Sequence, residues 1–564
     1  MSTAERIVVI GGVAAGPKAA AKARRCNPRA RITMVEKGRH VSYGGCGMPY
    51  LISGEVESAD ELMATPMGTL RTPEFFKKGK NIDVLIRHEA TRIDRDAKQV
   101  EVKNLETGKT TALDYDKLVL AVGSTATKPD LPGADLKNVL GLACMEDAQT
   151  LVAALNSGKI KRAVCCGGGL VTLETVHGLV KRGVETAVVC RSDQILFRLD
   201  YEMGACARRE LEKGGVAVYT GETLKAFIGK DGTVCAVETD KRRIEADMVL
   251  YAKGVKPNTK LAKEAGLAIG ESGAIQVDEC LRTSDPDIYA AGDCAETTHL
   301  VTGKHSYNPR GSTANKMGRV VGVNATGGSD TFPGVLGNLV LRVLNLQIGK
   351  VGLTEKEARA EGYDIETVIV PGFDKAHFYP DADRVILKLV ADRKTGKLLG
   401  MQGAGHGEVV KRIDVATAML TLGSDVYTLA NLDLGYAPPF GSAMDPIITA
   451  ANVMKNKLEG RAVGISPVEV KKKLDDGGDF VFLDVRNDDE YEEEHIPGTT
   501  LIPLGKLKER MGELPKDKEI IGFCAISLRA YAACLTLKAN GFENVKFMDG
   551  GMAAWPYERE AKEG

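Results

Sequence analysis

The stretch RIVVIGGVAAG, Arg6 to Gly16, decides the fold of the first part of the chain. Its apolar, β-branched start predicts a strand over 6–10, and the Ala-, Lys- and Arg-rich segment after the glycine-rich turn predicts a helix to about residue 25. Gly11 and Gly16 are the first and third glycines of a G-x-G-x-x-G pattern, in which Val13 replaces the second. Such a turn places a pyrophosphate at the helix N-terminus, where unpaired N–H groups and the helix dipole favour an anion.

Three later features extend this turn into a dinucleotide site. The next strand, 32–35, is followed by Glu36 at a spacing suited to a ribose hydroxyl. LVLAVGS (118–124) and TSDPDIYAAGDC (283–294) are strands that enter small-residue turns. One glycine-rich turn is weak evidence because such turns are common, but the succession predicts a single site. Its candidate residues are Gly11, Gly12, Val13, Ala15, Gly16, Glu36, Ala121, Gly123, Gly292 and Asp293.

The run SYGGCGMPY, Ser42 to Tyr50, contains a candidate redox thiol, Cys46. Flavin reductases with two redox thiols need a C-x-x-x-x-C pair, but the second position here is Leu51. Cys46 would therefore form a disulfide or persulfide with a small thiol or sulfane sulfur, or react with a peroxide. A buried structural cysteine is the alternative. We favour the redox role, because three flanking glycines suggest close approach of a cofactor and exposed N–H groups that lower the pKa of the thiol.

Composition limits the partners and the compartment. The 564 residues suggest three or four domains, and 75 basic side chains balance 76 acidic ones, so no global charge favours nucleic acid or a membrane surface. We expect small-molecule or protein partners. We also expect a cytoplasmic protein, because no apolar stretch reaches membrane-spanning length and the N-terminus lacks an apolar leader. The 12 cysteines form no C-x-x-C pairs, so we expect no metal site and no disulfide framework.

A second dinucleotide unit opens at AVCCGGGLVTLE, 163–174. Thr172 stands where the third glycine normally permits tight packing, and Cys190 stands where an acidic residue would select NAD. With Arg191 beside it, a 2′-phosphate would be paired rather than repelled, so NADPH use is one prediction. The alternatives are a site that accepts NADH or NADPH and, last, impaired nicotinamide binding. The candidate residues are Gly167, Gly169, Glu174, Arg191 and Gly254.

These segments, in this order, resemble the two-dinucleotide-binding flavoprotein disulfide reductases. The resemblance implies an FAD domain with a nicotinamide domain nested inside it, and Asp293 holding the ribityl chain. The pattern S-x-x-x-C-G-x-P-Y resembles the active-site motif of coenzyme A disulfide reductases and their persulfide-reducing relatives. It implies that Ser42 lies at the cofactor and substrate sites and that Lys22 and Arg25 contact coenzyme A phosphates. Basic residues late in a helix can instead simply favour its C-terminal dipole.

Residues 328–452 lack glycine-rich turns and resemble the family's dimerisation domain. This implies a homodimer in which tyrosines reach the partner subunit's redox cysteine. Tyr436, in LDLGYAPPFGSAMDP, matches that role better than Tyr379, because Phe378 could occupy the same family position. Ordinary core or interface aromatics are the alternative for both tyrosines.

The last hundred residues resemble a rhodanese domain. The segments VFLDVRNDDEY, EEHIPGT, IIGFCAISLRA and FMDGGMAAW carry the resemblance. Cys524 and Arg529 form a C-x-x-x-x-R motif in which backbone N–H groups and the arginine would stabilise a thiolate or a persulfide. Ser527 replaces a glycine common in rhodaneses, and the apolar side chains in this loop argue against small anionic donors such as thiosulfate.

The predicted fold class is α/β, with two nested Rossmann-like domains, an α+β dimerisation domain and a C-terminal α/β rhodanese domain. The expected boundaries are 1–150 and 263–327 for the FAD domain, 151–262 for the NAD(P) domain, 328–452 for dimerisation, 453–466 for a linker and 467–564 for the rhodanese.

The predicted function is FAD-dependent reduction of coenzyme A persulfide, polysulfide or coenzyme A disulfide by NADH or NADPH. Cys46 would be the redox centre, and Tyr436 of the partner subunit would donate a proton. An NAD(P)H oxidase or peroxidase is the second hypothesis, but Ala14 occupies the place of its usual histidine. A sulfur-trafficking or redox-sensing protein with a decayed nicotinamide site is the third.

Overall fold

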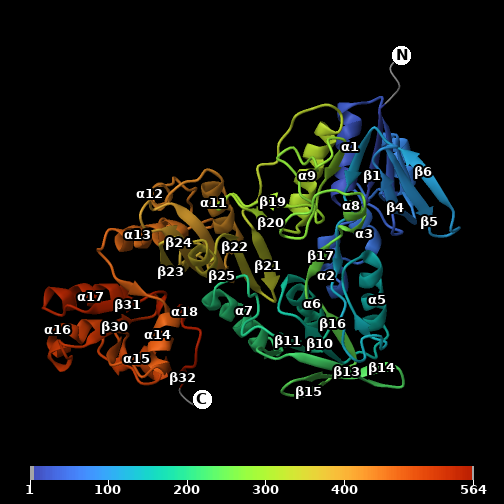
Figure 1. Cartoon of the computed structure of the whole chain (residues 1–564). Coiled ribbons are helices and arrows are strands. Elements are labelled where there is room, and N and C mark those ends of the chain that lie inside the picture. The colour runs from blue at the N-terminus through green and yellow to red at the C-terminus, as the bar shows by residue number, and fades with distance from the viewer. Residues whose placement is uncertain (1–4, 562–564) are drawn as a thin grey trace. The chain divides into compact units, whose positions relative to one another are not determined.

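The computed structural model describes residues 5–561 and separates into two compact units. The first unit extends to Asp193 and includes Gly215–Val335, and the second comprises Gln194–Gly214 and the chain from Leu336 onward (Figure 1). Each unit contains two sheets of five strands. None of the helices described within 5–561 is both long and apolar enough to cross a membrane.

The first sheet of unit 1 is parallel, with strand order β18-β7-β1-β2-β3. The strands are β1 (Arg6–Ile10), β2 (Arg31–Glu36), β3 (Ile82–Ile86), β7 (Lys117–Leu120) and β18 (Ile288–Ala290). Parallel strands have their carboxyl ends at one edge of a sheet. The turns that follow β1, β7 and β18 therefore lie side by side, although the third comes from far along the chain.

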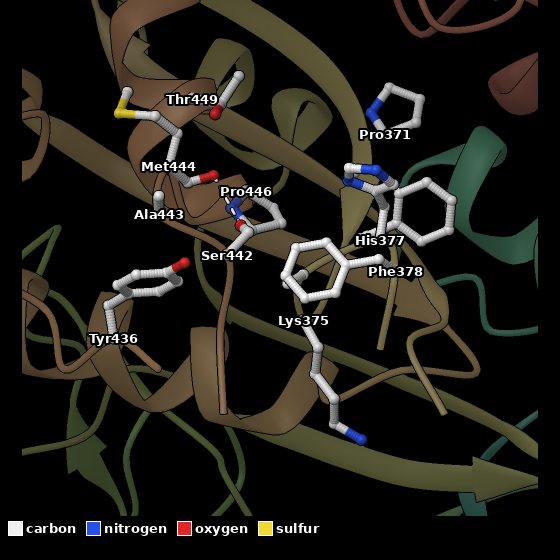
Figure 2. Close-up of a pocket in the computed structure, with 13 residues that line it drawn as sticks. Pro371, Lys375, His377, Phe378, Tyr436, Ser442, Ala443, Met444, Pro446 and Thr449 are labelled. Carbon is white, nitrogen blue, oxygen red and sulfur yellow. Dashed lines mark hydrogen bonds between the residues drawn. The ribbon is translucent and has the colours of Figure 1, made fainter. Parts of the chain in front are cut away.

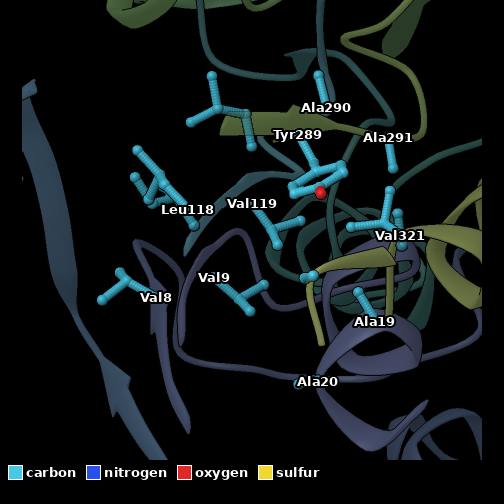
Figure 3. Close-up of a cluster of buried hydrophobic side chains, with 14 of the residues drawn as sticks. Val8, Val9, Ala19, Ala20, Leu118, Val119, Tyr289, Ala290, Ala291 and Val321 are labelled. Atoms are coloured by element: carbon cyan, nitrogen blue, oxygen red, sulfur yellow. The ribbon is translucent and has the colours of Figure 1, made fainter. Parts of the chain in front are cut away.

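Two helices, α1 (Ala15–Cys26) and α9 (Gly311–Asn324), pack closely against each other in this unit. A Cβ added to Gly318 would lie 2.4 Å from the carbonyl oxygen of Ala15, so the backbones approach where only glycine fits. Figure 3 shows the core that joins α1 and α9 to the sheet, with side chains from both helices and from β1, β7 and β18. This packing fixes the N-terminus of α9 relative to the strand ends.

The second sheet of unit 1 is also parallel, with strand order β12-β11-β10-β16-β9. Its strands are β9 (Val139–Leu140), β10 (Arg162–Cys166), β11 (Glu185–Val189), β12 (Ala217–Tyr219) and β16 (Met248–Tyr251). Helix α6 (Leu170–Lys181) follows β10 through the second glycine-rich turn. This is the nested strand–turn–helix unit that the sequence predicts.

Unit 2 begins with an antiparallel sheet of order β21-β22-β25-β24-β23. Its strands are β21 (Leu339–Val343), β22 (Leu346–Gly352), β23 (Ile365–Phe373), β24 (Arg384–Asp392) and β25 (Leu398–Gly405), and α11 (Val409–Thr421) and α13 (Pro446–Leu458) pack on it. Helix α7 (Tyr201–Lys213) also packs on this sheet, beside β25 in Figure 1, although its sequence lies within 151–262.

The rest of unit 2 is a parallel sheet of order β26-β31-β30-β27-β29. Its strands are β26 (Gly464–Ile465), β27 (Phe480–Asp484), β29 (Thr500–Leu501), β30 (Glu519–Phe523) and β31 (Val545–Met548), and α17 (Leu528–Ala539) follows β30. The segment 453–466, expected as a linker, begins inside α13 and ends with β26 paired to β31. It is thus ordered secondary structure at both ends.

Candidate active site

The carboxyl ends of β1, β7 and β18 form a cradle in which two glycines are sterically required. Gly11 has φ 106°, and a Cβ on it would lie 2.0 Å from the carbonyl oxygen of Ala121. A Cβ on Gly16 would lie 1.8 Å from the carbonyl oxygen of Gly11. A Cβ on Gly292 would lie 3.1 Å from that of Ala15, which begins α1. The residues predicted from three separate segments are therefore brought together.

Unpaired donors and carboxylates line this cradle. The N-cap of α1, Ala14, makes no side-chain capping bond, so the first N–H groups of the helix are left for an anion. The carboxylate of Glu36 accepts hydrogen bonds from the backbone N–H groups of Gly12 and Gly38, both at 2.6 Å. Ser42 donates its backbone N–H to the carbonyl of Gly12 at 2.8 Å. These features fit the pyrophosphate and ribose of a dinucleotide such as FAD.

Asp293 lies at the end of the same cradle. It accepts a hydrogen bond from the Ser124 hydroxyl at 3.3 Å, just after Gly123, which has φ 65°. Burial raises the pKa of the Asp293 carboxyl above its ordinary value, although Ser124 and Arg310 oppose the shift. A half-buried carboxylate at the end of this cradle can accept hydrogen bonds from the hydroxyls of a polyhydroxyl chain.

Cys46 lies in a single 3-10 turn, Gly45–Gly47, that precedes α2 (Met48–Ser53). A Cβ added to Gly311, the first residue of α9, would lie 3.5 Å from the Cys46 sulfur. The thiol thus lies against the N-terminus of a 14-residue helix. The positive end of the helix dipole stabilises a thiolate there, and glycine leaves space for substrate atoms.

The surroundings of Cys46 correct one expectation. Partial burial of the sulfur, and then the carboxylates of Glu174 and Asp293, raise the pKa of the thiol above its ordinary value. Arg310 and a backbone N–H group lower it by less. The glycine-flanked turn therefore does not by itself give a low pKa, because burial of the sulfur, and then two acidic groups from other segments, raise the pKa of the thiol.

Arg310 and Gly311 were missed by the sequence analysis. Their segment, NPRGS at 308–312, contains a Pro and a Gly where a helix begins, which was the available signal. It predicts a helix start without indicating what lies against it. Contact with Cys46 joins residues more than 260 positions apart, which local patterns do not reveal.

The second glycine-rich turn, between β10 and α6, shares features with the cradle at the ends of β1, β7 and β18. Gly167 has φ 134°, and a Cβ on it would lie 2.4 Å from the Ala252 carbonyl oxygen. Gly169 is the N-cap of α6 and leaves that helix without a side-chain cap. Thr172 is buried, and its hydroxyl has no hydrogen-bond partner within the part of the chain that the structure describes. The turn fits a second pyrophosphate, and an additional phosphate oxygen would satisfy an uncapped helix end.

Three further predicted residues surround this turn. Glu174, on α6, is buried enough that the pKa of its carboxyl rises to about 7, with Arg310 opposing the shift. Cys190 is buried after β11, and Arg191 beside it is exposed. Gly254, with φ 96°, precedes β17 (Val255–Pro257), which pairs with β8 (Ser124–Ala126) and so joins this domain to the first cradle.

Basic side chains gather on and beside α1. Burial lowers the pKa of Lys80, and the charges of Arg25, Arg71 and Lys18 lower it further, so the four cations are close together. Arg71 also donates to the Ser42 carbonyl at 3.0 Å. Arg25 is therefore part of the cluster. The sequence analysis missed Arg71 and Lys80, which lie outside the recognised motifs.

Lys22 has a different environment. It is half-buried, and its Cβ would lie 2.7 Å from a Cβ added to Gly322 of α9, so the base of its side chain contributes to helix packing. A long lysine side chain can pack its methylene groups and still extend its ammonium group to a ligand.

Tyr436 lines a cavity of about 280 Å³ in unit 2. Figure 2 shows Tyr436 and Phe378 on opposite sides of this cavity, with Ser442 and His377 also facing it. Tyr436 is 54% exposed, so its hydroxyl is accessible. Tyr379 is half-buried and is not part of the lining, whereas Phe378 is 69% exposed. Phe378, and not Tyr379, thus faces this cavity.

Cys524 lies in the loop between β30 and α17. Two N–H groups of α18 (Gly551–Ala554), those of Met552 and Ala553, donate to the carbonyls of Cys524 and Ala525 at 2.8 and 3.0 Å. A Cβ on Gly551 would lie 2.2 Å from the Cys524 carbonyl oxygen. This close approach explains the glycine at position 551.

Ser527, which replaces a glycine common in rhodaneses, adopts the backbone conformation that favours glycine. Ser527 has φ 76°, the left-handed region that favours glycine, and its hydroxyl donates to the Met548 carbonyl at 2.8 Å. Arg529 makes a bidentate ion pair with Glu490, at 2.6 and 2.7 Å. Glu490 and, to a smaller extent, the neighbouring Cys524 raise the pKa of the guanidinium.

Comparison with known proteins identifies the family and the domains of the chain. The family sequence model described as pyridine nucleotide-disulphide oxidoreductase matches residues 5–316, and the model of the dimerisation domain of that family matches 341–447. A rhodanese-like domain model matches 466–557. The chain belongs to the pyridine nucleotide-disulphide oxidoreductase family and carries a rhodanese-like domain, which confirms the predicted fold class and enzyme class.

Three similar proteins are named for sulfur, persulfide or coenzyme A chemistry. The NAD(P)H sulfur oxidoreductase (CoA-dependent) of Pyrococcus abyssi is 37% identical over 80% of this chain and 98% of its own. The structure of an NAD-dependent persulfide reductase from A. fulgidus is 43% identical, with a TM-score of 0.92 over 98% of this chain and 100% of its own. The structure of reduced Bacillus anthracis CoADR-RHD is 33% identical, with a TM-score of 0.92 over 98% of both chains.

Proposed function

We propose that this protein is an FAD-dependent NAD(P)H oxidoreductase that reduces coenzyme A persulfide, polysulfide or coenzyme A disulfide through Cys46 alone. Its rhodanese domain would carry sulfane sulfur on Cys524. The observation that carries the proposal is the position of one thiol, without a C-x-x-x-x-C partner, against the N-terminus of α9 and close to both Asp293 of the first cradle and Glu174 of the second dinucleotide unit.

Cys46 would perform the sulfur chemistry. For a persulfide substrate, its thiolate attacks the outer sulfur of R–S–SH, the S–S bond breaks, R–SH leaves and Cys46 carries the outer sulfur. FAD, when bound at Gly11, Glu36 and Asp293, would supply the two electrons from the nicotinamide that release this sulfur as HS⁻ and restore the Cys46 thiolate. Tyr436 of the partner subunit would give a proton to the departing sulfur.

The basic cluster supports coenzyme A as the thiol carrier. Lys18, Arg25, Arg71 and Lys80 present positive charge to one region, and Arg71 bonds Ser42, four residues before Cys46. Phosphates bind such clusters through charge-assisted hydrogen bonds. Lys22 would extend its ammonium group to the same ligand. A disulfide without phosphates would gain nothing from these charges.

The nicotinamide site would accept NADPH as well as NADH. No acidic side chain stands at Cys190, and the exposed Arg191 could pair a 2′-phosphate. Gly167, with φ 134°, and the uncapped N-terminus of α6 at Gly169 support a dinucleotide pyrophosphate at this turn. We therefore do not favour a decayed nicotinamide site.

Anaerobic mixing tests the proposal. Purified enzyme is mixed with NADH or NADPH, and flavin absorbance is followed; coenzyme A disulfide, coenzyme A persulfide or hydrogen peroxide is then added. We expect flavin bleaching with a nicotinamide and turnover on the sulfur substrates. Cys46→Ser should abolish that turnover, by about a hundredfold or more, and leave bleaching intact. Loss of bleaching as well would mean that the redox thiol has been misplaced.

The same experiment separates the alternatives. Rapid turnover on peroxide would favour the oxidase or peroxidase, and no bleaching with either nicotinamide would favour the trafficking protein. Cys524→Ser is the matched control in the second unit. It should remove sulfur transfer to cyanide and spare reduction of coenzyme A disulfide.

A further inference from the structure

A cavity of about 270 Å³ opens over Cys524, and two domains form its walls. Ile526, Leu528 and Arg529 come from the rhodanese loop and α17. Phe373 and Arg384 come from β23 and β24 of the antiparallel sheet, within the same compact unit. The donor site of the sulfurtransferase is therefore not completed by the rhodanese domain alone.

The walls of this cavity carry large apolar side chains that are exposed to solvent. Leu528 is 70% exposed, Ile526 is 40% exposed and Phe373 is 38% exposed. Large apolar side chains gathered around a nucleophile, rather than scattered singly, indicate a ligand that covers them. Straight alkyl groups adjacent to the reacting sulfur would do so.

The charge of the cavity points to an anion with a single charge. Arg529 is compensated by its bidentate pair with Glu490. Within residues 5–561, no ion pair joins the Arg384 guanidinium to a carboxylate; it lies over the Phe373 ring, 5.7 Å from the ring centroid. One uncompensated cation matches a persulfide anion, R–S–S⁻. Thiosulfate carries two negative charges, and Glu490 would repel the second.

We infer that the Cys524 cavity is a donor site for persulfides on a straight alkyl arm, with Phe373, Arg384, Ile526 and Leu528 as its specificity-determining residues. This inference rests on the proposed role of Cys524 as a sulfur carrier. The bound R–S–S⁻ takes the proton of the Cys524 thiol, the resulting thiolate attacks the outer sulfur of R–S–SH, the S–S bond breaks, R–SH leaves with that proton and Cys524–S–S⁻ forms. Cyanide then takes the outer sulfur as thiocyanate and restores the thiolate.

A donor series tests the inference in the flavin-loaded enzyme without nicotinamide. The donors are thiosulfate and methyl, propyl and pentyl persulfides generated in situ, and thiocyanate is measured. Each methylene that enters the cavity should raise kcat/KM about threefold until the cavity is filled. Thiosulfate should be the poorest donor. Rates that are independent of alkyl length, or thiosulfate as the best donor, would overturn the inference.

Three variants accompany the donor series: one changes the cavity wall, one is its control and one changes the charge. Leu528→Asn should lower kcat/KM for pentyl persulfide about fivefold, and so reduce the preference for pentyl persulfide over thiosulfate. Leu535→Asn changes another exposed leucine of α17 that does not line the cavity, and should have no effect. Glu490→Gln should raise kcat/KM for thiosulfate about tenfold by freeing the Arg529 charge. Equal effects of the two leucine variants, or no gain with Glu490→Gln, would contradict the inference.

The same measurements distinguish failure of the donor-site inference from failure of the proposed function. If Cys524→Ser transfers sulfur as fast as the unchanged enzyme, Cys524 is not the carrier and both ideas fall. If transfer depends on Cys524 but ignores alkyl length, only the donor-site inference falls.

Discussion

The pKa of the Cys46 thiol depends on acidic residues from distant parts of the chain. After burial of the sulfur, Glu174 raises that pKa most, because its carboxylate disfavours a second negative charge nearby. Burial also raises the pKa of the Glu174 carboxyl, to about 7. At pH 8 to 9 it is ionised and suppresses thiolate formation, whereas below pH 7 it takes up a proton and this effect fades.

Glu174→Gln should therefore increase the thiolate fraction of Cys46. We expect alkylation of Cys46 by iodoacetamide at pH 8 to be faster by roughly threefold, with the midpoint of the rate against pH moved downward. The contribution of Cys46 is obtained by subtracting the rate of the Cys46→Ser variant. Glu185→Gln, at an exposed position that begins β11, is the control. An unchanged profile for Glu174→Gln would mean that this carboxylate does not act on the thiol.

At the residue scale, short motifs in the sequence single out candidate reactive residues better than they indicate the groups that surround them. Cys46 and Cys524 could be singled out because each lies in a short motif with its own backbone geometry. Gly311 and Glu490 could not, because their roles come from contacts with a thiol or guanidinium in another segment. The predicted lowering of the Cys46 pKa was wrong, because burial of the sulfur and two carboxylates from other segments raise it.

At the element scale, α6 departs from the glycine-rich dinucleotide motif, and this departure destabilises the folded protein. Thr172 replaces a glycine, and its buried hydroxyl has no partner within 5–561. A buried unsatisfied polar group costs about 1–3 kcal/mol. Thr172→Val keeps the shape and removes the hydroxyl, so the apparent Tm of the flavin-loaded enzyme without nicotinamide should rise by about 2 °C.

Thr175→Val is the matched control on the same helix. Thr175 is equally buried, but its hydroxyl donates to the Val171 carbonyl at 2.7 Å. Its replacement removes a hydrogen bond and should leave the Tm unchanged or lower. If both variants shift Tm alike, the missing partner of Thr172 has no energetic consequence.

The elements themselves were largely predictable from the sequence. The first strand and helix appear as β1 and α1, because periodicity and turn chemistry are local signals. Helix α7 illustrates the limit. Its sequence follows the second dinucleotide strand pair, yet Asp200 at its N-cap accepts a hydrogen bond from Gln402 of β25 and Glu202 contacts Lys388 of β24. Amphipathicity predicts that a helix buries one face, without indicating which sheet covers it.

At the scale of the whole molecule, one buried ion pair joins the rhodanese domain to the antiparallel domain. Lys457 of α13 reaches Asp549 at 2.7 Å, and its ammonium also donates to the Thr367 carbonyl at 2.7 Å. Both charged side chains are almost fully buried. Asp549 directly precedes Gly550 and Gly551, which support the Cys524 loop. The two domains are therefore held together next to the Cys524 loop.

Removal of one partner should destabilise this junction strongly. Burial raises the pKa of Asp549 to about 6, and Lys457 lowers it, so Lys457→Met should raise it further. An uncompensated buried charge costs about 3–5 kcal/mol. A carboxyl with a raised pKa in the folded state is stabilised by its proton, so this loss should be largest above the folded pKa and shrink as pH falls below it. Thermal inactivation of sulfur transfer at pH 5 and pH 8 measures both effects. The Lys457→Met, Asp549→Asn double variant should recover most of the stability and lose the pH dependence; equal inactivation of the single and double variants at pH 8 would contradict the ion-pair account.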